Sequence, residues 1–188
     1  MAHDITYTIR FFSYWHCGSG LSAGADVDNL VIKDSQGMPF IPGRTIKGLV
    51  REAAENYLRL CNKDELSEKL TCSFGVEANS TDNGTKGCMH FGNAVLDKKE
   101  YNAIVASNAQ EYLYDKVTST AIGDEGTVKD YSLRSIEVTV PCTLYGQIYD
   151  VPEELMPVIV ECLGLIKRIG QKRNRGLGRC DIMEGGKE

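Results

Sequence analysis

Long hydrophobic runs are missing from this sequence of 188 residues. A membrane-spanning helix needs about 18 apolar residues in succession. The start of the chain also lacks the basic and apolar segments of a secretory leader, and no internal repeat is visible. These absences predict an intracellular, cytoplasmic protein with no membrane partner. The length suits a single domain with an insertion.

Paired cysteine motifs are missing as well. The chain has seven cysteines, an odd number, and no two of them form a C-x-x-C pair. A disulfide framework usually shows an even set of cysteines at regular spacing, so this pattern is typical of free thiols in a reducing compartment.

An excess of positive charge is also lacking, because 21 lysines and arginines stand against 26 acidic residues and leave a net charge of −5. That average argues against a nucleic-acid partner. The distribution differs from the average. Between Leu165 and Cys180 there is no acid, and the cations there are Lys167, Arg168, Lys172, Arg173, Arg175 and Arg179. A polyanion can therefore bind locally to this acidic protein.

Hydrophobic periodicity divides the chain into strands and helices. Residues Ile5–Tyr14 alternate as in a strand, Thr45–Leu60 has helical spacing with Thr45 as its expected cap, and Glu153–Ile169 predicts a second helix. Further strands are expected within Leu30–Lys33, Cys88–Leu96, Ser135–Ile148 and Arg179–Met183, with a polar surface loop over 61–87 and a projecting hairpin at Thr118–Asp130. This order predicts an α+β fold with an antiparallel sheet and helices on one face, a ferredoxin-like or RRM-like core.

Two segments of the sequence carry motifs that are more specific than this general fold pattern. Residues 28–51 read DNLVIKDSQGMPFIPGRTIKGLVR, and residues 169–179 read IGQKRNRGLGR. The first resembles the signature of the RAMP superfamily of CRISPR effector subunits, in which an aspartate, a Gly-x-Pro and an Ile-Pro-Gly run precede the first helix. The second resembles the C-terminal glycine-rich loop of that superfamily. His16–Gly20 is similar to its first glycine loop, and Leu133, Arg134 and Glu137 resemble the strand behind its thumb.

The context of Asp28 is most similar to the backbone subunit of type III interference complexes. The resemblance implies one domain over residues 1–188, with a palm, an insertion loop at 61–87 and a thumb-like hairpin at 115–134 whose apolar wedges are Ile122 and Val128. It also implies an endoribonuclease that binds guide RNA beside other copies of itself and other subunits, and that cleaves complementary target RNA at regular intervals. Two alternatives stay open: a noncatalytic RNA-binding or capping scaffold of the same complex, and a guide-RNA processing endonuclease.

The sequence departs from the superfamily pattern in three respects. Arg44 replaces the usual serine, Asn93 stands where an aspartate is common, and the chain is short for the group. The short chain suggests a small thumb.

The helix start and the glycine-rich loop supply the candidate RNA contacts. A helix N-terminus has unpaired N–H groups and a partial positive charge, so Arg44 and Thr45 could hold a phosphate, with Lys47 and Arg51 adding charge. The alternative is a solvated basic helix face. In the loop, the expected phosphate contacts are Lys172, Arg173 and Arg175, while Gly176 and Gly178 let the backbone approach RNA closely. The alternative is an ordinary basic helix C-terminus.

Asp28 is the candidate catalytic residue. Cleavage of RNA by its own 2′-hydroxyl needs a group that accepts the hydroxyl proton or holds a divalent ion, with Mg²⁺ expected. Asp26 and Asp34 lie nearby, but Asp34 precedes Ser-Gln-Gly and suits a turn, and the resemblance favours Asp28. His16 could position RNA or donate a proton, although a lone histidine beside a strand is more often packed in the core.

A zinc site is a further hypothesis. Cys61, Cys72, Cys88 and His90 could form a Cys3His set, since some members of the superfamily carry zinc in the corresponding region. Their spacings are not those of common zinc fingers. Buried free cysteines are the alternative.

Overall fold

The structure is a computed structural model, and it describes residues 2–22, 27–76, 84–122, 125–127 and 132–186. At its centre is an antiparallel sheet of β1 (Ala2–Phe11), β4 (His90–Phe91), β7 (Thr143–Pro152) and β8 (Cys180–Glu184), in the order β4-β7-β1-β8. Helix α1 (Gly43–Leu60) follows β1, and helix α4 (Met156–Leu165) follows β7. This β-α-β-β-α-β order is the ferredoxin-like plan, so the predicted α+β palm is confirmed.

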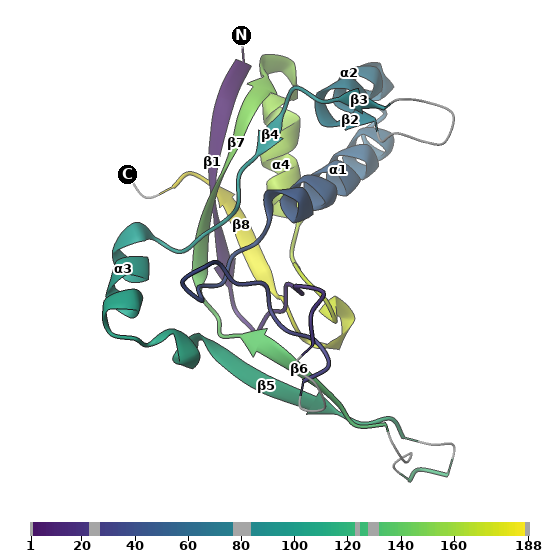
Figure 1. Ribbon diagram of the computed structural model, residues 1–188. Coiled ribbons are helices and arrows are strands. Elements are labelled where there is room, and N and C mark those ends of the chain that lie inside the picture. Colours follow the sequence, from purple (N-terminus) through teal and green to yellow (C-terminus); the bar gives the residue numbers. More distant parts are fainter. Residues whose placement is uncertain (1, 23–26, 77–83, 123–124, 128–131, 187–188) are drawn as a thin grey trace.

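Helices α1 and α4 cover the same face of the sheet (Figure 1). In β1 every second side chain is buried, as strand alternation predicts. The buried residues of α1 recur at helical spacing and are Gly43, Ile46, Val50, Ala54 and Leu58. Fully burying one large apolar side chain contributes about 1.5–3 kcal/mol. This packing between sheet and helices therefore holds the first turn of α1 in a fixed place.

Helix α1 begins at Gly43, and the expected cap at Thr45 is wrong. Pro42 occupies the N-cap position without a side-chain hydrogen bond, and the Gly43 N–H donates to Oδ1 of Asn93 at 2.9 Å. A β-carbon on Gly43 would lie 1.9 Å from the Phe91 carbonyl oxygen. Glycine is required here because α1 starts in direct contact with the backbone of β4.

Replacing Gly43 with alanine is expected to destabilise the fold by about 2–3 kcal/mol, because the added carbon overpacks a backbone contact. For a chain of this length that loss lowers the melting temperature by roughly 4–12 °C. Gly48 is the matched control, since a β-carbon there meets nothing within 4 Å and alanine favours the helix by about 1 kcal/mol. Equal melting temperatures of the two variants would contradict this packing.

The prediction of a plain surface loop over residues 61–87 is wrong. The segment contains a 3₁₀ helix (Asp64–Leu66), α2 (Ser67–Phe74) and an antiparallel ribbon of β2 (Gly75–Val76) and β3 (Thr85–Lys86). Leu70 and Phe74 of α2 are buried and pack in the hydrophobic core of the palm. Residues 77–83, which carry much of the polar run, lie outside the described residues.

Helix α4 is shorter than predicted. A 3₁₀ turn at Glu153–Leu155 precedes it, and it ends at Leu165 rather than Ile169. Ile166 has an extended backbone, and Arg168 pairs with Arg179 in an isolated bridge. The residues beyond Leu165 therefore begin the glycine-rich loop instead of extending the helix.

The strand expected at Leu30–Lys33 does not form a continuous ladder. Val31 pairs with Gly18, and Lys33 pairs with Pro39, each in an isolated bridge. A strand needs successive residues that pair with one neighbour. This segment contacts different neighbours in turn, so its apolar composition reflects packing rather than a strand.

Strands β5 (Tyr114–Ser119) and β6 (Arg134–Thr139) form a separate antiparallel hairpin that projects from the palm (Figure 1). We call it the thumb hairpin. The strand pair expected over Ser135–Ile148 is divided, because β6 belongs to the thumb hairpin and β7 to the palm. Of the expected wedges, Ile122 is 70% exposed, and Val128 lies outside the described residues.

A further helix, α3 (Lys98–Ala106), and a 3₁₀ turn (Gln110–Leu113) join β4 to the thumb hairpin. The Asp97 side chain caps α3 by accepting hydrogen bonds from the N–H groups of Lys99 and Glu100. Within the described ranges, no helix is long and apolar enough to cross a membrane.

Candidate nucleic-acid interface

A cavity of about 380 Å³ lies where the start of α1 meets the glycine-rich loop at residues 170–179. One wall is the first turn of α1, a second is the loop, and segment His16–Gly18 after β1 closes it. We call it the α1–loop cavity. Its lining residues come from three separate segments of the sequence, which lie within residues 16–18, 42–49 and 170–173.

The glycine-rich loop is held by backbone contacts that leave no room for a side chain at Gly178. The Gly178 N–H donates to the Tyr14 carbonyl oxygen at 2.7 Å, and the Ile169 N–H donates to the Gly178 carbonyl oxygen at 2.9 Å. A β-carbon on Gly178 would lie 1.9 Å from the Ile169 carbonyl oxygen, and φ at Gly178 is +72°. The close packing of Gly178 fixes the loop against the segment that follows β1, so its cations are carried on a defined backbone.

His16 lies behind the α1–loop cavity with one ring nitrogen unsatisfied. The residue is fully buried, and Nδ1 lies 2.6 Å from the Glu137 carbonyl oxygen, so Nδ1 carries a proton. Nε2 is buried without a hydrogen-bond partner. Such an atom costs about 1–3 kcal/mol, which makes it a candidate ligand contact. Burial raises the pKa of the neighbouring Cys17 thiol to about 11, so that thiol is not a nucleophile at neutral pH.

The charges of α1 follow an order that is unfavourable for an isolated helix. Its first turn contains no acid, although the partially positive N-terminal end of a helix favours acids. Arg44, Lys47 and Arg51 follow on successive turns of its N-terminal half, and Arg51 pairs with Glu55 at 3.0 Å. A bound anion would offset this arrangement, so this half of α1 is suited to phosphate.

The structure brings some of the predicted RNA contacts together. Arg44, Thr45 and Arg173 line the α1–loop cavity. Lys47 and Arg51 line a second cavity that shares Arg44. The predicted contacts on α1 are therefore distributed over two adjoining hollows rather than along one exposed face.

Other predicted contacts lie on the outside of the loop. The Arg175 N–H donates to the Lys172 carbonyl oxygen at 2.8 Å, and neither side chain lines the α1–loop cavity. A β-carbon on Gly176 would meet nothing within 4 Å. Gln171, which the sequence did not single out, lines the cavity, and its N–H donates to the His16 carbonyl oxygen at 2.9 Å.

Asp28 is fixed against the start of strand β6 in the thumb hairpin. Its N–H donates to the Ser135 carbonyl oxygen at 2.8 Å, and its Oδ2 accepts from the Ser135 N–H at 2.8 Å. Oδ1 lies 3.5 Å from the guanidinium of Arg134, and 39% of the Asp28 side chain is exposed. The carboxylate is therefore held by the backbone of β6 and still open to a ligand.

Glu137 links the Asp28 segment to the α1–loop cavity. Its carboxylate accepts hydrogen bonds from the Val31 N–H at 3.0 Å and from Lys33 Nζ at 2.7 Å, while its carbonyl oxygen contacts His16. Ser135, which holds Asp28, is two residues away on the same strand, about 7 Å along it. Strand β6 thus positions both Asp28 and His16.

Asp34 does not compete for this place, because its carboxylate is used within its own segment and by Tyr101. Asp34 Oδ1 accepts from the N–H groups of Gln36 and Met38, both at 2.9 Å, and its Oδ2 accepts from the Tyr101 hydroxyl at 2.8 Å. That last bond raises the pKa of Tyr101. Asp34 therefore builds a turn, as expected, and Asp26 lies outside the described residues.

The four candidate zinc ligands do not assemble into a site. Cys61, Cys72 and Cys88 are exposed, and no group of three or more His, Cys, Asp or Glu in the described part of the chain could hold a metal ion. His90 packs near the ring of Tyr149, with ring centroids 5.9 Å apart. The zinc hypothesis is corrected accordingly. The cysteines are free, as the alternative held, but these three are exposed rather than buried.

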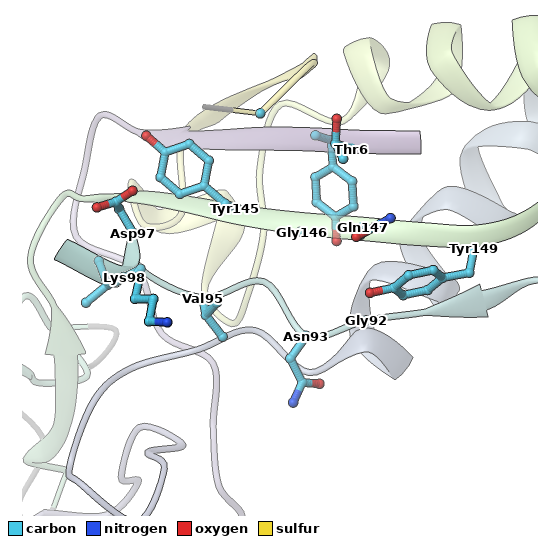
Figure 2. A pocket seen from close by; sticks show the side chains of 13 residues that line it. Thr6, Gly92, Asn93, Val95, Asp97, Lys98, Tyr145, Gly146, Gln147 and Tyr149 are labelled. Carbon is cyan, nitrogen blue, oxygen red and sulfur yellow. The ribbon is translucent and has the colours of Figure 1, made fainter. Parts of the chain in front are cut away.

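The other face of the palm sheet carries a cavity of different character, about 460 Å³ in volume. Tyr145, Gln147 and Tyr149 lie along β7, and Asn93 and Val95 lie along the neighbouring segment (Figure 2). Asp97 and Lys98 contribute charges of both signs. This lining carries charges of both signs, whereas the charged residues that line the two cavities at the N-terminal half of α1 are all cations.

Comparison with known proteins agrees with the fold. The model of the RAMP superfamily matches residues 8–181, and no curated protein matches. One similar chain, from the cryo-EM structure of type III-B Cmr-beta bound to cognate target RNA, has 12% identity and a TM-score of 0.71, with 97% of each chain covered. Another, from the apo state of type III-B Cmr-beta, has 14% identity and a TM-score of 0.66, with 96% of each chain covered. At these identities the likeness shows a shared fold.

Proposed function

This chain belongs to the RAMP superfamily, and on that basis we propose that it is an RNA-binding backbone subunit of a type III CRISPR ribonucleoprotein. In this role it holds the sugar–phosphate backbone of a guide RNA, beside further copies of itself and other subunits. Base pairing between guide and target RNA supplies the sequence recognition, while the protein contacts backbone and helix shape.

The observation that carries this proposal is the α1–loop cavity. It combines the positive end of α1 with the guanidinium groups of Arg44 and Arg173. A phosphate group can satisfy the helix end and both guanidinium groups, whereas an apolar or cationic ligand cannot. The similarity of the fold to a chain of Cmr-beta bound to target RNA supports the same role.

We extend the proposal to cleavage of the target RNA at Asp28. The 2′-hydroxyl of one ribose attacks the adjacent phosphorus, a 2′-oxygen–phosphorus bond forms, and the bond to the 5′-oxygen of the next nucleotide breaks. Asp28 accepts the hydroxyl proton, and the guanidinium of Arg134, 3.5 Å from its carboxylate, contacts the phosphate. The leaving 5′-oxygen takes a proton from water, and Asp28 returns the proton it accepted to solvent. The products are a cyclic 2′,3′-phosphate and a 5′-hydroxyl, so no reactant other than solvent is needed.

A divalent ion fits this place only as a partner of the RNA itself. In the described residues no three potential ligands lie together, so Asp28 would share Mg²⁺ with phosphate oxygens, a mode of binding that Mg²⁺ favours. A bound ion would supply charge stabilisation at the phosphate. Asp28 and Arg134 hold their positions through contacts within the protein.

Two other functions differ from this one in what they do to RNA. A noncatalytic scaffold of the same complex binds guide RNA and leaves the target intact. A guide-processing endonuclease cuts repeat RNA in the absence of any target. Regularly spaced cuts in a target paired with the guide distinguish the proposed function from both.

The first test measures the affinity of the full chain for an end-labelled single-stranded RNA at several salt concentrations. Each phosphate contact contributes about −0.7 to the slope of log affinity against log salt for a single strand. The proposal predicts a negative slope equivalent to several contacts. Absence of RNA binding at low salt would contradict it.

A further inference from the structure

A second cavity adjoins the α1–loop cavity along α1. It has a volume of about 320 Å³ and lies between α1 and the inserted ribbon of β2 and β3, which Figure 1 shows grouped with α2 next to α1. Arg44 and Gly48 line both cavities. The second cavity, here called the ribbon cavity, therefore continues the first one across the surface of α1.

Cations from two separate elements line the ribbon cavity. Arg44, Lys47 and Arg51 come from α1, and Lys86 comes from β3. Among the described residues that line it, none is acidic. Like charges gathered in one hollow repel each other, and a polyanion that neutralises them removes this cost. The ribbon cavity thus has the charge of a phosphate site.

The ribbon is held in a fixed position by its glycines. A β-carbon on Gly75 would lie 2.4 Å from the Gly87 nitrogen, and one on Gly87 would lie 2.3 Å from the Ser73 carbonyl oxygen. Gly75 also has a φ of +81°. Its partner across the ribbon is Lys86. Direct backbone packing on the end of α2 therefore fixes the wall that carries Lys86.

Arg51 is positioned in advance as well. Its guanidinium lies 5.9 Å from the ring centroid of Phe74, and that buried ring packs against Phe91 at 5.6 Å. Its Nε donates to Glu55 at 3.0 Å, and 31% of the Arg51 side chain is exposed. A guanidinium held in this way loses little freedom when it binds an anion.

We propose that the ribbon cavity binds a second phosphate of the same RNA strand, with Lys86 as the contact supplied by the insertion. This inference rests on the proposed function, which places the first phosphate in the α1–loop cavity. Residues 74–76 and 85–87 of the insertion then form the second wall of a continuous RNA path, and α1 forms the floor. The cationic lining selects the sugar–phosphate backbone rather than the bases.

The test compares Lys86→Gln with the wild-type chain in the salt titration with single-stranded RNA. Loss of one phosphate contact is expected to reduce the magnitude of the salt slope by about 0.7, with weaker binding to every RNA sequence. Lys86→Arg keeps the charge and is expected to retain the wild-type slope. Lys86 is exposed, so these substitutions leave the fold intact.

Lys99→Gln is the matched control, since Lys99 is an exposed lysine on α3 and lines neither cavity. Its slope is expected to equal that of the wild type. An unchanged slope in Lys86→Gln, or an equal reduction in both variants, would overturn the inference. If Lys86→Gln kept the wild-type salt slope but lost binding to a neighbouring subunit, the inference would also be overturned. The occupant of the ribbon cavity would then be an acidic protein surface. Failure of the wild-type chain to bind RNA would instead contradict the proposed function, and it is measured before any variant.

Discussion

Replacing Gly48 with glutamate is expected to weaken RNA binding at least about 100-fold while the fold is retained. Gly48 lines both the α1–loop cavity and the ribbon cavity, and a β-carbon there meets nothing within 4 Å. The new carboxylate would lie in the path of the phosphates. Like charges placed together cost several kcal/mol, and each 1.4 kcal/mol is about a factor of ten. Filter binding with a labelled single-stranded RNA measures the effect.

Gly164→Glu provides the matched control for this variant. Gly164 lies in α4, a β-carbon there also meets nothing within 4 Å, and neither cavity includes it. Both substitutions add one negative charge to a helix, so only position distinguishes them. If Gly48→Glu bound RNA with wild-type affinity, α1 would not be the surface that contacts RNA. If both variants lost the same RNA affinity, the added negative charge of the whole protein would explain the effect.

Asp28→Asn is expected to slow target cleavage by about 10²–10⁴-fold, the range for loss of a general base. Asparagine keeps an oxygen that can accept the hydrogen bond from the Ser135 N–H, which Asp28 Oδ2 accepts at 2.8 Å, so the substitution removes the charge with little change of structure. Guide and target binding are expected to stay unchanged. The assay uses the guide-loaded complex with labelled complementary RNA, in magnesium and in EDTA.

Asp115→Asn is the matched control, because it removes a carboxylate from the thumb hairpin at another position. Asp115 lies on β5, and its Oδ2 accepts a hydrogen bond from the Tyr14 hydroxyl at 3.1 Å. This variant is expected to cleave like the wild type. Normal cleavage by Asp28→Asn would exclude Asp28 as the base. Intact target with the wild-type complex would leave the noncatalytic scaffold as the function.

The parts of the fold that follow a strong local pattern could be predicted from the sequence. Helix α1 buries Ile46, Val50, Ala54 and Leu58, one residue per turn, and that spacing is visible in the sequence itself. Strand β1 alternates in the same visible way, although it ends at Phe11 rather than Tyr14. Periodicity works in these elements because one continuous face is buried against a single neighbour.

The insertion could not be predicted in this way. Its helix α2 buries little more than Leu70 and Phe74, and β2 and β3 have two residues each, which is too short to show a period. What holds the ribbon is close backbone packing at Gly75 and Gly87. Glycines in a polar segment suggest a loop, so the sequence pattern indicated the wrong structure.

The candidate site was predictable in its charges but not in its arrangement. The cations of α1 and of the glycine-rich loop were visible in the sequence, and so was Asp28. The division into two adjoining cavities, and the place of Lys86 in one of them, depend on how the insertion packs. The unsatisfied nitrogen of His16 depends on its contact with Glu137, 121 residues away. Spacing alone likewise could not show that the zinc candidates stay apart.

Cross-linking of the full chain to bound RNA, followed by identification of the linked peptides by mass spectrometry, tests the central claim most directly. The claim is that RNA follows α1 between the glycine-rich loop and the inserted ribbon. Linked peptides are therefore expected from residues 43–51, 84–87 and 170–175. Links confined to the opposite face of the palm sheet, at Tyr145 and Tyr149 (Figure 2), would contradict it.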